Sequence, residues 1–81
     1  MDQKIYNAIV KAIATQKHMD SSAIGRESTL EQLGVSSLDA ITIVYEIEEQ
    51  FDVEVPNDAL ENLRTVQDIV DGISALVEAN A

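Results

Sequence analysis

The chain has 81 residues, and its length, composition and charge exclude several classes of protein. This length suits a single domain over residues 1–81, and the absence of cysteine excludes a disulfide framework and a thiolate metal site. The first residues lack the apolar run of a signal peptide, and no stretch approaches the ~20 apolar residues that cross a bilayer. We therefore expect a cytoplasmic monomer without membrane contact.

The charge of the chain is strongly acidic and unevenly distributed. The net charge is −10, and residues 27–81 contain thirteen acidic residues against one base, Arg64. Such a field repels nucleic acid and anionic membranes and attracts basic protein surfaces. With only three aromatic residues and no basic patch, nucleic-acid binding is excluded. The alternative is that the acidic residues only keep a small protein soluble.

The N-terminal third of the chain predicts one helix followed by a long connection. Ile5, Ile9 and Ile13 recur every four residues and indicate an amphipathic helix over about 3–16. The connection covers 18–35 and contains two glycines. Within it, the Ser-Thr-Leu-Glu run at 28–31 is suited to capping a single turn.

The next helix, predicted from the serine pair at 36–37 to about residue 51, has more apolar surface than one core requires. We assign the first of its two apolar arcs to the core; it contains Ala40, Ile43, Val44, Ile47 and Phe51. The second arc, which we call the apolar strip, consists of Leu38, Ile41 and Tyr45, edged by Asp39, Glu48 and Glu49. An apolar strip rimmed by charge is typical of a protein-binding surface. Burial of this helix on both sides is the alternative.

The C-terminal third predicts two further helices. Pro56 opens a short third helix through about residue 62. Thr65 and Asp68 have the spacing of a capping box, and the apolar pattern after them predicts a last helix to about Glu78. The expected fold is all-α: a four-helix bundle with three longer helices, one short third helix and a long loop between the first two.

The serine pair at the start of the middle helix carries the main functional hypothesis. Ser36 and Asp39 have capping-box spacing, so Ser36 takes the structural role. Ser37 then becomes the first helical residue, with its hydroxyl at the positive end of the helix dipole. That position favours a phosphate ester. Ser37 therefore has the chemistry for a phosphodiester attachment, whereas a lone serine at a helix start is ordinarily only a cap.

Catalytic and metal-binding roles find no support in the sequence. A nucleophilic serine needs a base, yet the single histidine, His18, lies on the polar stretch that ends the first helix. The Gly-x-Ser-x-Gly elbow is missing, and the acidic residues around 46–54 lack the pattern of a calcium loop. We predict no catalytic residue and no formed metal site.

Three segments in combination resemble the acyl carrier protein family. They are residues 33–39 (LGVSSLD), 47–56 (IEEQFDVEVP) and 65–68 (TVQD), and the likeness extends over nearly the whole chain. It implies a 4′-phosphopantetheine arm on Ser37, transferred from coenzyme A by a carrier protein synthase (a phosphopantetheinyl transferase) with magnesium. The arm's thiol then holds acyl groups as thioesters, the bundle interior shelters the acyl chain, and the protein itself catalyses nothing.

The resemblance also implies partners, namely acyl-transferring and ketosynthase-type enzymes with basic docking patches, in fatty-acid, polyketide or other lipid biosynthesis. The residues implied to meet them are Ser36, Leu38, Asp39, Ile41, Tyr45, Glu48 and Glu49. The family usually has Asp where this chain has Ser36, and Thr42 and Tyr45 also depart from the common pattern. These departures favour a specialised carrier. Two alternatives stay open: an unmodified acidic adaptor that docks through the apolar strip, and an aminoacyl or peptidyl carrier, which the acidic C-terminal part disfavours.

Overall fold

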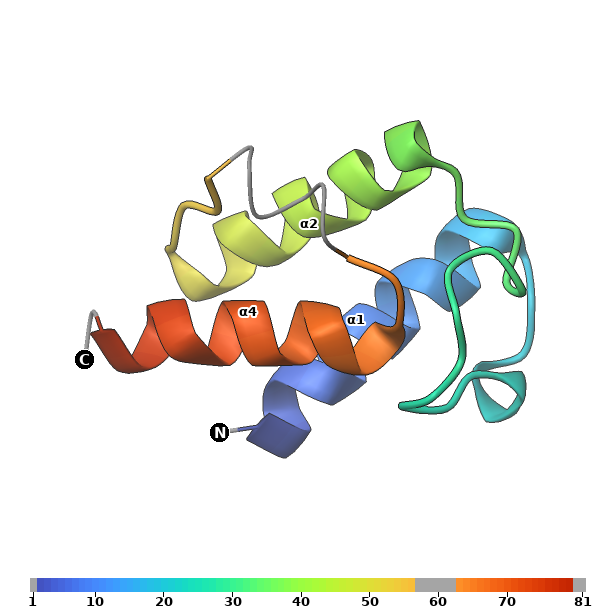
Figure 1. Ribbon diagram of the computed structural model, residues 1–81, viewed down its shortest axis with the longest axis horizontal. Coiled ribbons are helices and arrows are strands. Elements are labelled where there is room, and N and C mark those ends of the chain that lie inside the picture. The colour runs from blue at the N-terminus through green and yellow to red at the C-terminus, as the bar shows by residue number, and fades with distance from the viewer. Residues whose placement is uncertain (1, 57–62, 80–81) are drawn as a thin grey trace.

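The computed structural model describes residues 2–56 and 63–79, and these form an all-helical structure (Figure 1). Its α-helices are α1 (Asp2–Lys17), α2 (Ser37–Phe51) and α4 (Val66–Ala79), and a 3-10 turn, η1, covers Ser21–Ala23. The described ranges contain no strand, so the predicted all-α class and the three longer helices are confirmed. The predicted short third helix falls on residues 57–62, outside the described residues. None of the helices in the described part is long and apolar enough to cross a membrane.

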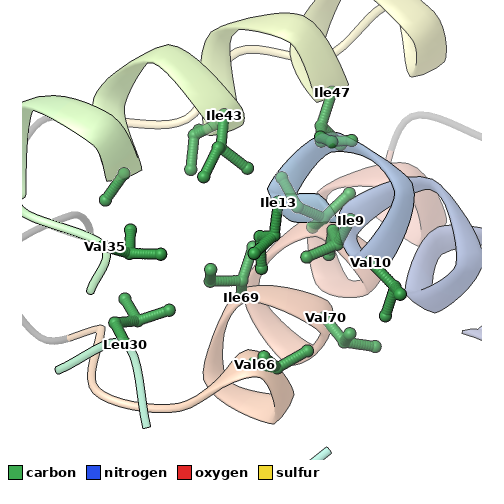
Figure 2. Close-up of a cluster of buried hydrophobic side chains, with 14 of the residues drawn as sticks. Ile9, Val10, Ile13, Leu30, Val35, Ile43, Ile47, Val66, Ile69 and Val70 are labelled. Atoms are coloured by element: carbon green, nitrogen blue, oxygen red, sulfur yellow. The ribbon is translucent and has the colours of Figure 1, made fainter. Parts of the chain in front are cut away.

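The core lies where the inner faces of the three helices meet, with α1 packed against both α2 and α4 (Figure 2). It is built largely from isoleucines that are at most 2% exposed: Ile5, Ile9, Ile13, Ile43, Ile47, Ile69 and Ile73. The arc of α2 that the sequence assigned to the core is buried as predicted, with Phe51 half-buried against it. Each large isoleucine removes apolar surface from water, which is the main term that stabilises so small a domain.

The start of α4 has the capping box that the sequence predicts. The amide of Asp68 donates to Thr65 Oγ1 and the amide of Thr65 donates to Asp68 Oδ2, both at 3.1 Å. The Arg64 amide also donates to Asp68 Oδ2, at 3.0 Å. The amides of Arg64 and Thr65 hold the pKa of Asp68 below its ordinary value. The first turn of α4 is therefore firmly placed.

The connection over 18–35 is tied to this first turn by main-chain hydrogen bonds, which the sequence did not indicate. The Leu30 amide donates to the Arg64 carbonyl at 2.8 Å, and the amides of Val66 and Gln67 donate to the carbonyls of Ser28 and Arg26. An isolated antiparallel bridge joins residues 29 and 65. The loop that leads into α2 is thereby held against α4.

Gly34 and Gly72 are expected to respond to alanine in opposite ways. Gly34 has φ +74°, which is costly for a residue with a side chain, so Gly34→Ala should destabilise the fold by about 1–2 kcal/mol. Gly72 is a helical residue, and a Cβ there meets nothing within 4 Å, so Gly72→Ala should stabilise by about 0.5–1 kcal/mol. Urea unfolding of both variants measures the two shifts. Changes in unfolding free energy of the same sign in the two variants would contradict this prediction.

Candidate functional site

The N-terminus of α2 is closed by a reciprocal cap that fixes which serine is structural. The Asp39 amide donates to Ser36 Oγ at 3.2 Å, and the Ser36 amide donates to Asp39 Oδ2 at 3.1 Å. Ser36 has the extended backbone of an N-cap, and the helix begins at Ser37. The predicted division of the serine pair is confirmed: Ser36 is the cap and Ser37 is the first helical residue.

Asp39 also joins this helix start to the end of α1. Lys17 Nζ lies 3.0 Å from Asp39 Oδ2, and Gln16 Nε2 donates to Asp39 Oδ1 at 3.0 Å. The Lys17 ammonium group, followed by the Ser36 amide and the Gln16 side chain, lowers the pKa of Asp39 from 3.8 to about 2. The carboxylate therefore stays ionised and holds the N-terminus of α2 against α1.

This contact should make part of the stability depend on pH. Because folding lowers the pKa of Asp39, its ionised form stabilises the fold above about pH 4, and this contribution disappears as the pH falls through about 2. Asp39→Asn should therefore be less stable at pH 7 and lose less stability than the wild type between pH 4 and 2. Urea unfolding over a pH series measures this difference. Lys17→Met should reproduce part of it, and parallel pH curves for wild type and Asp39→Asn would contradict it.

The Ser37 hydroxyl is accessible and uncommitted. Ser37 is exposed, and among the described residues no hydrogen bond engages its hydroxyl. A cavity of about 630 Å³ opens beside it, with Leu30, Val35, Ile41 and Arg64 among its walls. A free hydroxyl at the first turn of a helix, next to a cavity of this size, fits a covalently attached group that carries a phosphate.

The outer face of α2 carries the apolar strip in exposed positions. Leu38 is 77% exposed, Ile41 48% and Tyr45 61%, and they are the exposed large hydrophobic residues of the described structure. Glu49 is exposed and Glu48 half-buried along the same helix. The alternative of a helix buried on both sides is wrong for the described part of the chain. The strip is available to a partner.

Comparison with known proteins identifies the family. The profile of the family described as "Phosphopantetheine attachment site" matches residues 7–73. The acyl carrier protein of Guillardia theta is 35% identical over 79 residues, covering 96% of this chain and 98% of that protein. The chain belongs to the acyl carrier protein family. The acyl carrier protein of Syntrophobacter fumaroxidans is 44% identical over 64 residues, covering 78% of this chain and 79% of its own.

The carrier also shares its fold with a solved member of the family. The crystal structure of an acyl carrier protein from Thermotoga maritima superposes with a TM-score of 0.88, covering 99% of this chain and 94% of the other at 22% identity. Membership brings 4′-phosphopantetheine as the covalently attached cofactor. The exposed hydroxyl of Ser37 and the adjoining cavity fit that group, so the residues present agree with the family's chemistry.

The site residues predicted from the sequence fall into two groups in this carrier. Leu38, Ile41, Tyr45 and Glu49 lie exposed along α2, with Glu48 half-buried beside them. Ser36, which is exposed, and Asp39, which is half-buried, are engaged in intramolecular contacts, namely the cap and the contact with α1. The sequence did not indicate Lys17 and Gln16, which hold Asp39; the only local signal is a basic residue in the last turn of α1.

The remaining polar candidates contribute no further site in the described structure. His18 is exposed just after α1, with φ 54°. Residues 2–56 and 63–79 contain no group of three or more His, Cys, Asp or Glu side chains placed to hold a metal ion. The exposed Glu46 and Glu49 and the half-buried Glu48 extend the negative field of α2 instead.

Proposed function

We propose that Ser37 is the residue that carries 4′-phosphopantetheine, and that this carrier presents acyl groups to the enzymes of a lipid-forming pathway. The observation that carries this proposal is that only one of the two neighbouring serine hydroxyl groups is used in a hydrogen bond. Ser36 Oγ accepts the Asp39 amide, whereas the Ser37 hydroxyl is exposed and uncommitted within the region that matches the family. The thiol of the bound arm supplies the thioester chemistry. The chain's part is to hold the arm and present its cargo, which is a carrier's role and not an enzyme's.

Loading of the wild-type protein tests this proposal. Incubation with coenzyme A, magnesium and a carrier protein synthase should add a single phosphopantetheine to the intact mass, and peptide mapping should locate it on Ser37. The carrier purified from its own cells should release an acyl group with hydroxylamine, and the mass of that group identifies the cargo. A wild type that stays unmodified with an active synthase would refute the proposal.

A half-open cavity along α4 offers a place for the acyl chain. A second cavity, of about 410 Å³, lies between α2 and α4. Its walls are mostly apolar and include Val44, Leu63, Ile69, Ile73 and Leu76. A cavity of this size and lining suits an aliphatic chain, because apolar groups leave water on entering it. We assign it as the shelter for bound acyl groups.

The apolar strip is proposed as the docking surface for the synthase and for acyl-transferring and ketosynthase-type enzymes. Its large side chains stand exposed next to Glu48 and Glu49, so an enzyme with a basic patch around an apolar recess complements it. Such contacts weaken as salt rises, which suits a carrier that must leave each partner. An adaptor without the prosthetic group is not favoured, because the family match covers the attachment region.

Several finer properties belong to the same proposal. We infer a single domain over 1–81, folded as the four-helix bundle expected from the sequence and acting as a monomer in the cytoplasm. Ser36 stands where the family commonly has Asp, which removes a negative charge beside the attachment residue. This difference, together with Thr42 and Tyr45, supports a specialised set of partners over general fatty-acid synthesis.

A further inference from the structure

The cavity beside Ser37 is lined mainly by apolar side chains and by one arginine, a combination that suits a ligand with an anionic end and an apolar extension. It lies between the loop that precedes α2, the first turns of α2 and the segment that precedes α4. Its apolar walls are Leu30, Val35, Ala40, Ile41 and Leu63. The only basic side chain among its lining residues is that of Arg64. At about 630 Å³ the cavity is within the size range of small-molecule sites.

Arg64 is placed at this wall by its own backbone. Its amide donates to Asp68 Oδ2 at 3.0 Å, and its carbonyl accepts the Leu30 amide at 2.8 Å. The guanidinium group therefore extends from a fixed point, although the residue itself is exposed. Arg64 is also the only base after residue 26. Arg64 thus places a positive charge at the cavity that Ser37 lines, and this charge favours an anionic ligand there.

We propose that this cavity seats the phosphodiester end of the prosthetic arm, with Arg64 as its counter-ion; this rests on the proposed attachment at Ser37. A phosphodiester is anionic at neutral pH, and arginine pairs with phosphate oxygens through several N–H groups in a fixed plane. Since the phosphate is tethered to a residue that itself lines the cavity, the pairing is intramolecular, and a weak contact is sufficient to populate it.

The neighbouring wall gives the seated arm a direction. Ile41 lines the cavity and also belongs to the apolar strip, at 48% exposure. An arm that leaves Arg64 along the apolar wall therefore emerges beside the surface proposed for partners. The pairing with Arg64 thus sets the path of the arm toward a docked enzyme.

Two acidic residues limit the strength of this contact. Glu31 is exposed and lines the cavity, so it competes with the phosphate for Arg64. The second is Asp68, whose pKa is lowered chiefly by the amides of Arg64 and Thr65 and to a smaller degree by the positive charge of Arg64. The pairing should consequently be moderate, sensitive to salt, and stronger when Glu31 is neutralised.

NMR of the loaded carrier tests the proposal. Wild type, Arg64→Gln, Glu31→Gln and the control Lys11→Gln, which removes a positive charge from the exposed face of α1, are each loaded and checked by intact mass. In the wild type, loading should shift the Arg64 Nε–Hε resonance and the amides of Leu30 and Glu31. The phosphorus resonance of the arm should move in Arg64→Gln and stay in place in Lys11→Gln. Glu31→Gln should enlarge the shift of the Arg64 resonance.

Each outcome decides between the two proposals. If the wild type gains no mass, the attachment at Ser37 fails. If it gains the mass, but loading leaves the Arg64 Nε–Hε resonance of the wild type in place and the phosphorus resonance is the same in wild type, Arg64→Gln and Lys11→Gln, only the seat at Arg64 is refuted. Shifts at Leu30 and Leu63 methyl groups that persist in Arg64→Gln, without any phosphorus shift, would place the apolar part of the arm in the cavity and also refute the ionic contact.

Discussion

Ser37→Ala is expected to lose all incorporation of phosphopantetheine, whereas Ser36→Ala should retain it. The two neighbouring residues differ in their hydrogen bonding: Ser36 Oγ accepts the Asp39 amide, and the Ser37 hydroxyl is exposed and uncommitted. Ser36→Ala removes the cap and should reduce the free energy of unfolding by about 0.5–2 kcal/mol. The measurement is intact mass after exposure to coenzyme A, magnesium and a carrier protein synthase, together with urea unfolding.

The paired design separates loss of the acceptor from loss of the fold. Ser37→Ala should unfold at nearly the same urea concentration as the wild type, because its side chain makes no hydrogen bond in the described structure. Ser36→Ala should be the less stable variant and still become loaded. If Ser37→Ala gained phosphopantetheine, or if Ser36→Ala were the only variant that failed to gain it, Ser36 would be the attachment residue.

Ile43→Ala and Ile41→Ala should separate stability from docking within one turn of α2. Ile43 is fully buried, so its truncation leaves a cavity and should cost about 2–5 kcal/mol of unfolding free energy. Ile41 is 48% exposed on the apolar strip, so its truncation should cost less than about 1 kcal/mol. The unfolding free energies from urea titration measure this contrast.

In partner binding the order of the two effects is reversed: Ile41→Ala should have the larger effect and Ile43→Ala the smaller. Ile41→Ala should raise the KM of the synthase for the apo carrier about tenfold, as expected for the loss of an interface anchor. Kinetics at temperatures well below the Tm of Ile43→Ala should give that variant a KM near the wild-type value. An unchanged KM for Ile41→Ala, with Tyr45→Ala likewise unchanged, would show that enzymes dock elsewhere.

The local features of this carrier were readable from the sequence because they depend on residues close together in the chain. Capping boxes join residues three apart, so the starts of α2 and α4 were predicted from Ser36 and Thr65. Helical spacing separated the core arc of α2 from the apolar strip, since a helix turns by a fixed angle per residue. The prediction for Ser37 is equally local, because it depends on the adjacent Ser36 being the N-cap.

The features that were missed join residues far apart in the chain. The contact of Lys17 with Asp39 spans 22 positions, and no periodic pattern relates the two. The hydrogen bonds between the 26–30 segment and the start of α4 use main-chain atoms, so side-chain identities give no hint of them. The cavity at Ser37 likewise depends on how the loop, α2 and Arg64 are brought together. Such arrangements follow from tertiary packing and not from local propensity.

The main-chain bridge between residues 29 and 65 has a consequence for how this carrier tolerates change. Its hydrogen bonds join peptide groups, so a substitution in the loop leaves the donors and acceptors in place unless it introduces proline. The exposed positions of this stretch, such as Glu31 at the rim of the cavity, can therefore exchange side chains without releasing its anchorage, whereas the buried Leu30 and Val35 and the left-handed Gly34 are fixed by the fold. New cargo or partner preferences can arise there by drift at little risk to folding.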